Sequence, residues 1–320
     1  MAIPSATQLY YDPIFLNHHT GDHPESPERL RQTVQHLTEA GLTDRCQRAT
    51  WAPATLEQLS RVHRPDYLKT LCDFADSGGG NIEPDTVLSP DSFQVALTAS
   101  GAACDAVSHI VENAASNALV LPRPPGHHAR PDAAMGFCLI NHAAVAAEAA
   151  LTEHQIDRVL VVDWDVHHGN GTQDIFWESE QVAFLSIHRW PFYPGTGSRD
   201  ETGSGRGLGT TCNVPLPHDT PRKEYLEHFT AALERLAAQH RPQLVILSAG
   251  FDAHRSDPVG SLGLETDDFQ TLTERVVDIA AVHAESRIVS ILEGGYNPTA
   301  LGESVAVHLR TLLQNEGAAK

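Results

Sequence analysis

The chain has 320 residues, of which 41% are hydrophobic and 20% charged, a composition that excludes a wholly disordered protein. With 41 Asp and Glu against 22 Lys and Arg, its formal net charge is −19, which argues against nucleic-acid and anionic-membrane partners and favours basic ones. No run of about 18 apolar residues is present, so we expect no membrane span.

Strand-like and helix-like segments alternate along the sequence. Continuous runs rich in Val, Ile and Leu predict buried strands at 118–121, 158–162, 182–187, 244–247 and 287–292. Helix-like segments lie around them at 102–113, 141–153, 221–239, 267–284 and 298–314. Pro221 is expected in the first turn of its helix, and Thr266 in the cap region of the next. This alternation predicts an α/β fold with a mostly parallel sheet, and because no repeat or linker divides the chain we expect a single domain over 1–320.

The residues that follow each predicted strand carry the functional signal, since parallel sheets bind ligands beyond the carboxyl ends of their strands. Histidine, aspartate, tyrosine or glycine stands in all five of these places. The stretches are 123–128, 163–171, 188–197, 248–254 and 293–297. Their convergence at one edge of a sheet predicts a site.

A metal site is the first candidate. Asp165 and His167 are two residues apart, and in extended backbone such residues point to the same side. Asp252, at another strand end, can supply a third ligand. This set suits zinc or a similar divalent ion and leaves a coordination position for water, as a catalytic site requires. An isolated Asp-x-His is more often a surface dipeptide, but the buried strand before it, Asp163 and the glycine-rich turn after it favour the metal site.

His127 and His128 follow Pro-Pro-Gly and are either a polar turn or a general acid/base pair aimed at water on the metal. Such histidines need partners that fix their tautomers, and Asp163 and Asn170 are the candidates. An Asp partner favours the imidazolium more than an Asn partner does, so we expect the pKa values of the two histidines to be split.

Tyr296 follows two glycines and is either a core tyrosine or a phenol that donates a hydrogen bond to an oxyanion opposite the metal. Arg29, in the segment His-Pro-Glu-Ser-Pro-Glu-Arg at 23–29, is interpreted as a surface charge at the start of a helix.

Six motifs in this order resemble the histone deacetylase family, which includes acetylpolyamine amidohydrolases, acetoin-utilisation proteins and bacterial deacetylase-like amidohydrolases. They are Arg-Pro-Pro-Gly-His-His-Ala at 123–129, Gly-Phe-Cys at 136–138, Asp-Trp-Asp-Val-His-His-Gly-Asn-Gly at 163–171, Pro-Gly-Thr-Gly at 194–197, Ser-Ala-Gly-Phe-Asp-Ala-His at 248–254 and Glu-Gly-Gly-Tyr-Asn at 293–297. The resemblance runs from about His18 to Leu312, and Asn170 resembles the class II branch. It implies the arginase/deacetylase α/β fold, with a mostly parallel sheet of about eight strands flanked by helices.

The resemblance also implies a mechanism. The zinc ligands would be Asp165, His167 and Asp252, with Fe²⁺ as the other metal to consider. His128 would activate water and later protonate the leaving amine, while His127, held by Asp163, would act electrostatically. Tyr296 would stabilise the tetrahedral oxyanion with the metal.

Substrate-binding and cation-binding residues follow from the same resemblance. Phe137, next to Gly136, and Tyr193 or its neighbour Phe192 would wall a narrow acyl-lysine tunnel. Asp91 would grip the substrate backbone at the rim, and Val259 stands where polyamine-specialised members can carry a gatekeeping glutamate. A structural K⁺ would use Asp163 and the backbones of Asp165, His167, Ser186 and Ile187.

These expectations converge on a zinc-dependent amidohydrolase that removes acetyl or other acyl groups from lysine in proteins or peptides. The alternative substrate is an acetylated polyamine or another small N-acyl amide. A non-catalytic acyl-lysine binding module is disfavoured because the ligands, the histidine pair and the tyrosine are all present. A binuclear hydrolase, which would need bridging carboxylates for a second metal, is also disfavoured. Scattered cysteines and the lack of a signal-peptide pattern in residues 1–13 predict a cytoplasmic protein, and a homo-oligomer is left open.

Overall fold

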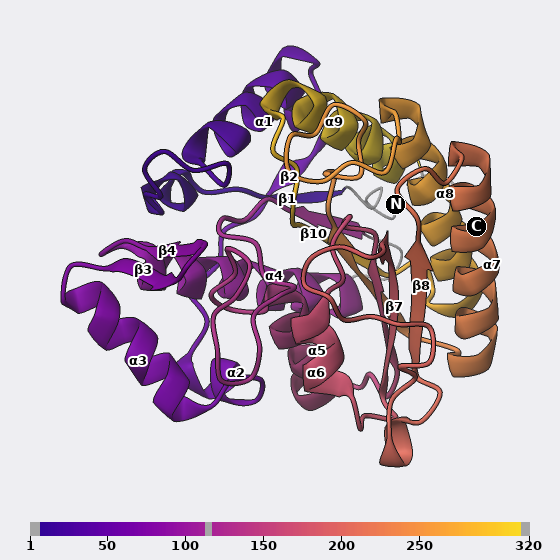
Figure 1. Cartoon of the computed structure of the whole chain (residues 1–320), viewed down its shortest axis with the longest axis horizontal. Helices are drawn as coiled ribbons and strands as arrows, with labels where there is room; N and C mark the ends of the chain where they lie inside the picture. The colour runs from indigo at the N-terminus through magenta and orange to yellow at the C-terminus, as the bar shows by residue number, and fades with distance from the viewer. Residues whose placement is uncertain (1–6, 113–116, 315–320) are drawn as a thin grey trace.

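A parallel β-sheet runs through the centre of the computed structural model, which describes residues 7–112 and 117–314 (Figure 1). Within these residues the sheet has eight strands, in the spatial order β2 (Gln47–Arg48), β1 (Gln8–Tyr10), β5 (Asn117–Val120), β10 (Ile288–Leu292), β9 (Leu244–Ala249), β6 (Val159–Asp163), β7 (Val182–Arg189) and β8 (Thr211–Leu216). Each neighbouring pair is parallel. The predicted α/β fold with about eight parallel strands is therefore confirmed.

Both faces of the sheet are buried, which explains why the strand sequences are continuously apolar. In β6, Leu160 and Val162 pack into one hydrophobic cluster, whereas Val159 and Val161 pack into a second cluster on the opposite face. All five predicted strands are confirmed within two residues at each end.

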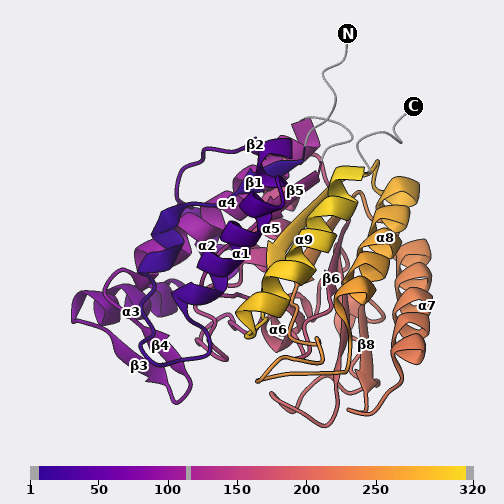
Figure 2. The same cartoon turned by 90° about the horizontal axis from the view of Figure 1, so that it is seen from above.

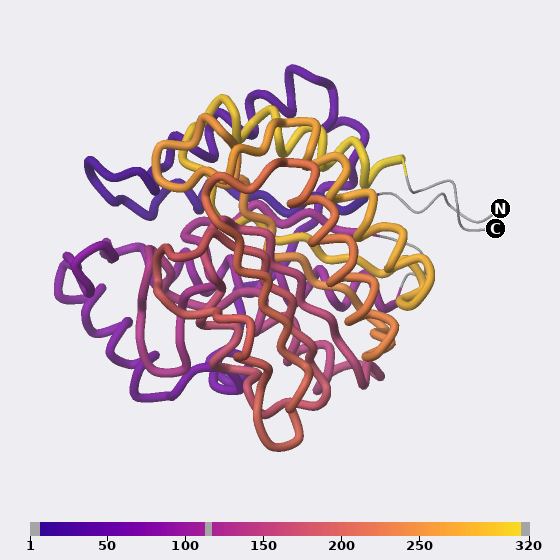
Figure 3. The backbone as a smooth tube through the Cα atoms, turned by 45° about the vertical axis from the view of Figure 1, so that its right-hand side comes forward, coloured from indigo at the N-terminus to yellow at the C-terminus, as the bar shows by residue number. Residues whose placement is uncertain are grey.

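Two layers of helices cover the sheet (Figure 2). One layer is a row formed by α1 (Pro27–Glu39), α9 (Pro298–Gln314), α8 (Thr266–His283) and α7 (Arg222–His240). The other holds α4 (Ser92–Glu112) and α5 (His142–Glu153), with α2 (Leu56–Ser60), α3 (Pro65–Asp76) and α6 (Asn170–Phe176) beside them. The N-terminal α1 thus packs against the C-terminal α9, as the indigo and yellow segments of Figure 3 show.

Smaller elements complete the described chain. An antiparallel pair, β3 (Gly80–Glu83) and β4 (Thr86–Leu88), lies outside the main sheet. Three short 3₁₀ turns are η1 (Pro13–Asn17), η2 (Thr43–Arg45) and η3 (Gly205–Gly207). Within the described ranges no helix combines the length and the apolar character needed to cross a membrane.

All five predicted helices are present, as α4, α5, α7, α8 and α9, with three differences at their ends, whereas α1, α2, α3 and α6 have no predicted range. α4 begins at Ser92, ten residues before the predicted start, and its predicted last residue, Asn113, lies outside the described residues. Gly101 weakens the helical signal, but a Cβ there would lie 2.1 Å from the carbonyl oxygen of Ala52, so the glycine permits close packing. Pro221 is the N-cap rather than a first-turn residue, and Glu265 instead of Thr266 caps α8.

Arg29 corrects a prediction, because it is 1% exposed and not a surface charge. It pairs with Glu25 at 2.9 Å, and Arg123 binds both oxygens of the same buried carboxylate at 2.6 and 2.7 Å. Burial raises the pKa of Glu25, but Arg123, His18 and Arg29 together outweigh burial and hold this pKa well below its usual value. One carboxylate therefore compensates the positive charges of two buried guanidinium groups.

Replacing Glu25 with alanine should lower the free energy of unfolding by about 3–5 kcal/mol, because it leaves buried positive charge uncompensated. Urea unfolding at neutral pH measures this loss. The matched control is Glu28→Ala, which removes an exposed carboxylate 3.6 Å from Arg31 and should cost less than about 1 kcal/mol. Since the folded-state pKa of Glu25 is depressed, its contribution is complete above 4.5 and is lost as the pH falls further. Equal losses in the two variants would contradict the assignment.

Candidate metal centre and catalytic site

The carboxyl ends of the central strands bring the predicted site residues together. Asp163, the last residue of β6, lies in register with Ser248 in β9 and Ser186 in β7. The segments that follow β6, β9 and β10 therefore start side by side. Their backbones are connected across the sheet edge, since Phe251 N–H donates to Gly294 O at 2.9 Å and Glu293 N–H to Ala249 O at 3.0 Å.

Asp165, His167 and Asp252 form a buried cluster. His167 Nδ1 lies 3.0 Å from Asp165 Oδ1 and 3.1 Å from Asp252 Oδ2, and the three potential ligand atoms lie within 4.8 Å of one another. All three side chains are buried. One imidazole nitrogen facing two carboxylate oxygens is a donor set that fits zinc or ferrous iron, both of which accept nitrogen and oxygen ligands.

The surroundings of this cluster favour an added positive charge. Burial and the charge of Asp165 raise the pKa of Asp252, and a divalent cation would offset the cost of two buried carboxylates so close together. Two glycines leave room for the carboxylates, because a Cβ on Gly250 would lie 2.1 Å, and one on Gly294 2.5 Å, from Asp165 Oδ2. The residues present thus fit the metal that their spacing predicts.

The histidine pair lies next to this cluster, with ring centroids 4.0 Å apart. His127 Nδ1 is 3.0 Å from Asp163 Oδ2, and His128 Nδ1 is 2.7 Å from Asn170 Oδ1. These are the two partners expected from the sequence. Because the Asn170 oxygen accepts from Nδ1, the Nε2 of His128 is left with its lone pair.

The two imidazoles have opposite pKa shifts. Burial alone would lower the pKa of His127, but Asp163 and Asp165 outweigh it and raise the pKa to about 10. Burial, followed by the charges on His127 and His167, holds the pKa of His128 well below 6.5. At neutral pH the pair therefore consists of a charged His127 and a neutral His128, which matches a stabilising charge beside a proton acceptor.

Tyr296 enters the site from the loop after β10. Burial raises the pKa of its phenol well above 10, so the group stays neutral and able to donate a proton in a hydrogen bond. The Arg29 guanidinium lies 4.7 Å from the ring centroid and donates to Gly295 O at 2.5 Å. Asp257 accepts the Tyr296 backbone N–H at 2.6 Å and those of Val259 and Gly260 at 2.9 Å. Arg29 and Asp257, neither of which the sequence assigned to the site, thus hold the tyrosine loop.

Three aromatic side chains surround these groups. Phe192 stacks on His167 with centroids 5.2 Å apart, and Tyr193 meets His128 edge to face at 5.2 Å. Phe137 lies on the Tyr296 side, 5.6 Å from its ring. Both Phe192 and Tyr193, which the sequence left as alternatives, therefore contact the site.

Gly136 and Phe137 form a tight turn with positive φ values of 54° and 69°, closed by paired hydrogen bonds between Met135 and Cys138. A Cβ on Gly136 would lie 2.4 Å from His128 Cδ2. The glycine thus lets the backbone approach the imidazole, while the turn presents the Phe137 ring.

Gly136→Ala should lower kcat for amide hydrolysis about 10- to 100-fold, because the new methyl group displaces the His128 ring. The matched control is Gly195→Ala, which also has a positive φ, 89°, but nothing within 4 Å of the added Cβ. Steady-state kinetics of both variants separate the clash from backbone strain. A loss of the same size in the control would contradict the explanation.

The mouth of the site lies near Tyr193, which is 37% exposed. A cavity of about 380 Å³ adjoins it, lined by Glu83, Asp85, Met135 and Tyr193 among others. Asp85 belongs to the turn between β3 and β4, and its carbonyl accepts from His23 Nε2 at 3.2 Å. The structure therefore brings Asp85 to the mouth.

Asp91 and Val259 are the other predicted substrate contacts. Asp91 is exposed just before α4, and no side-chain contact within the described residues joins it to the aromatic residues of the site. Val259 is half-buried, and its N–H donates to Asp257, the carboxylate that also accepts the Tyr296 N–H. Asp85 thus lies at the cavity beside Tyr193, and the substrate contacts of Asp91 and Val259 stay predictions.

Comparisons with known proteins agree with this geometry. The family profile of the histone deacetylase domain matches residues 23–312. A "Histone deacetylase-like amidohydrolase" of Pseudomonas aeruginosa is 41% identical over 280 residues, covering 86% of this chain and 73% of that protein. A human "Polyamine deacetylase HDAC10" is 37% identical over 302 residues, which cover 90% of this chain and 44% of that protein. The solved structure of the HDA15 HD domain matches with a TM-score of 0.92 and 36% identity, covering 97% of this chain and 90% of that one.

Proposed function

Because the chain belongs to the histone deacetylase family, and is thus a hydrolase of amide bonds, we propose that it removes acetyl or other acyl groups from the side-chain amine of lysine in proteins or peptides. The observation that carries this proposal is the convergence of a buried Asp/His/Asp set, a split histidine pair and a neutral phenol. Together they provide a metal site, a proton acceptor and an oxyanion donor.

Asp165, His167 and Asp252 would hold the ion, for which Zn²⁺ is the proposed cofactor and Fe²⁺ the other candidate. When bound there, a divalent ion supplies a Lewis acid that activates water and polarises the acyl carbonyl.

The proton transfers fall to His128. Its neutral imidazole accepts a proton from the attacking water as the new C–O bond forms. It returns that proton to the amine nitrogen as the C–N bond breaks, so the products are a carboxylate and an amine. Asn170 keeps the ring oriented through Nδ1.

Two neighbours stabilise the charge that develops. His127 stays protonated against Asp163 and adds a fixed positive charge beside the reacting carbon. The Tyr296 phenol donates a hydrogen bond to the acyl oxygen as its negative charge grows.

A structural K⁺ remains part of the proposal. Asp163 and Ser186 lie opposite each other at the ends of β6 and β7, and Ile187 follows directly. Asp163 Oδ1 also accepts the Asp165 N–H at 3.1 Å, which keeps the backbone of Asp165 close to the carboxylate, and the His167 N–H donates in turn to Asp165 Oδ1 at 2.9 Å. The carboxylate oxygens of Asp163 and the backbone carbonyl oxygens of these residues would be the hard ligands that a monovalent cation prefers.

The substrate class rests on the residues at the mouth. Val259 offers no charge to an internal ammonium group of a polyamine, and this favours acyl-lysine in a peptide. Acetylated polyamines remain the second candidate, because a relative is named a polyamine deacetylase and because Glu83 and Asp85 line the cavity at the mouth.

A kcat/KM panel with acetyl-lysine peptides, longer acyl-lysine peptides and mono-acetylated polyamines tests this choice. The proposal predicts higher values for acyl-lysine peptides, and it predicts that Val259→Glu shifts the ratio toward polyamines. A preference for polyamines in the wild-type protein would reverse the ranking of the two substrates.

A further inference from the structure

Glu293 is a buried carboxylate that the proposed mechanism does not use. It is the first residue after β10, it is 1% exposed, and no Lys or Arg side chain of the described residues forms an ion pair with its carboxylate. Arg29 binds only its backbone carbonyl, at 2.6 Å. A carboxylate buried without a cationic partner is costly unless hydrogen bonds compensate for lost water.

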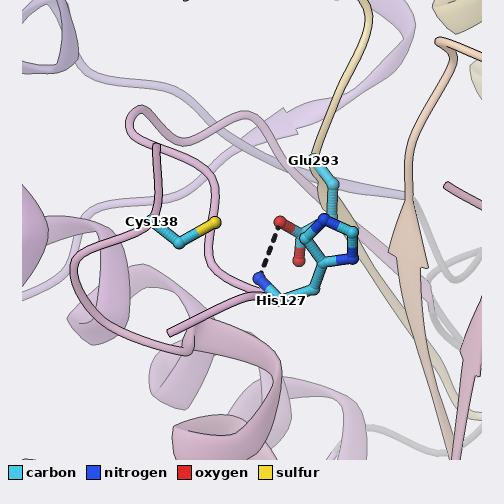
Figure 4. Close-up of side chains that lie close together, drawn as sticks. All are labelled: His127, Cys138 and Glu293. Carbon is cyan, nitrogen blue, oxygen red and sulfur yellow. Dashed lines mark hydrogen bonds between the residues drawn. The ribbon is translucent and has the colours of Figure 1, made fainter. Parts of the chain in front are cut away.

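Its hydrogen bonds lead directly to the histidine pair. Glu293 Oε2 accepts the backbone N–H of Gly126 at 2.6 Å and that of His127 at 3.2 Å, the bond drawn in Figure 4. The other oxygen, Oε1, accepts from Ser248 Oγ at 3.1 Å. One side chain thus connects the ends of β9 and β10 to the loop that carries both catalytic histidines.

Both backbone polar groups of His127 are hydrogen-bonded, and the Glu293 carboxylate binds the N–H. On the other side of this residue, its carbonyl oxygen accepts the Thr172 N–H of α6 at 3.2 Å. The preceding Gly126 packs closely against another segment, because a Cβ there would lie 2.8 Å from both His142 N and Ile140 O. The backbone that sets the directions of His127 and His128 is therefore fixed from three sides.

A second metal site is the other reading of this cluster, since His127, Cys138 and Glu293 bring potential ligand atoms within 4.8 Å of one another. Each atom already has a partner. His127 Nδ1 faces Asp163, the Cys138 thiol donates to Gly136 O at 3.3 Å, and both oxygens of Glu293 accept hydrogen bonds. Burial also raises the pKa of the Cys138 thiol well above its usual value, which disfavours the thiolate that a metal needs.

We propose that Glu293 is a positioning residue, whose carboxylate holds the Gly126–His127 backbone and so keeps the histidine pair in its productive orientation. This inference rests on the proposed function. Without the acceptor, two buried N–H groups lose their partner and the loop shifts toward another one. A displacement of about 1 Å at a proton-transfer group can slow the reaction by up to about 100-fold.

Three substitutions of Glu293 separate the effect of the length of its side chain from the effect of its charge. Glu293→Gln keeps an oxygen at the same distance but removes the charge, and its NH₂ can donate to Ser248 Oγ. Glu293→Asp keeps the charge but is one methylene too short to reach the Gly126 N–H. Glu293→Ala removes both. We expect Gln to retain kcat on an acetyl-lysine peptide within about threefold, and Asp and Ala each to lose about 10- to 100-fold.

KM and the amount of bound metal are measured for the same three variants. Both should stay near the wild-type values in all three variants, because within the described residues the hydrogen bonds of the Glu293 side chain reach neither the mouth nor the Asp/His/Asp set. If Glu293→Asp retains the wild-type kcat and Glu293→Gln loses it, the charge of the side chain and not its reach determines kcat, and the proposal is overturned. Full activity in both Asp and Ala also overturns it. An inactive wild-type protein would instead refute the proposed function, so the two failures are distinguishable.

Discussion

His128→Ala should lower kcat for deacetylation about 10²- to 10⁴-fold, the largest effect expected of any single substitution outside the metal ligands. His128 is the neutral imidazole of the pair, with Nδ1 held by Asn170 and Nε2 available to accept a proton. Its removal eliminates both the acceptor for the water proton and the donor for the leaving amine. Steady-state kinetics on an acetyl-lysine peptide, with bound metal measured in parallel, provide the test.

The control for this substitution is His228→Ala, which removes an exposed imidazole on α7 and should leave kcat unchanged. Exogenous imidazole should partly restore the His128 variant if the loss is one of proton transfer. A variant that keeps more than a tenth of the wild-type kcat would show that another group carries the proton.

Tyr296→Phe should lower kcat about 10²- to 10³-fold with little change in KM, because the phenol acts on the oxyanion rather than on the bound substrate. The ring itself should stay in place, since the contacts with Arg29 and Phe137 involve its faces and edges and not the hydroxyl group. The pKa of the phenol is raised well above 10, so in the wild-type protein its ionisation should not limit activity between pH 7 and about 9.

Tyr11→Phe is the matched control, because it removes a hydroxyl group from a half-buried tyrosine that lines a different cavity, together with Val34 and Arg48. Kinetics of both variants decide the assignment. Wild-type turnover in Tyr296→Phe would remove the tyrosine from the mechanism and leave the metal and His127 as the stabilising charges.

The parts that could be predicted from the sequence are those with a local signal. β6 is a continuous run of apolar residues because each face of the sheet has its own core, and the strand was placed within one residue at each end. β1 and β2 have three and two residues, too few to form a pattern. β8 contains Asn213 and Pro215, which obscure a strand but are tolerated at the edge of a sheet.

Site residues with a motif could be proposed in the same way, whereas their supports could not. Asp165 and His167 are two residues apart, but Arg29 and Gly295 are separated by 266 residues and Asp257 and Tyr296 by 39. A buried arginine or carboxylate that binds distant backbone atoms has no periodicity, so Arg29 was misplaced on the surface. The position of Asp85 has no sequence signal for a similar reason, since only the β3–β4 turn brings this side chain to the cavity beside Tyr193.

The central claim is that the Asp/His/Asp cluster makes this chain a metal-dependent deacylase. Its most direct test is kcat on an acetyl-lysine peptide after chelation and again after addition of about one equivalent of Zn²⁺, for the wild-type protein and for Asp252→Ala. We predict that chelation abolishes wild-type activity, that zinc restores it, and that zinc fails to restore the variant. Activity that survives complete removal of the metal, or a variant that zinc activates fully, would contradict the claim.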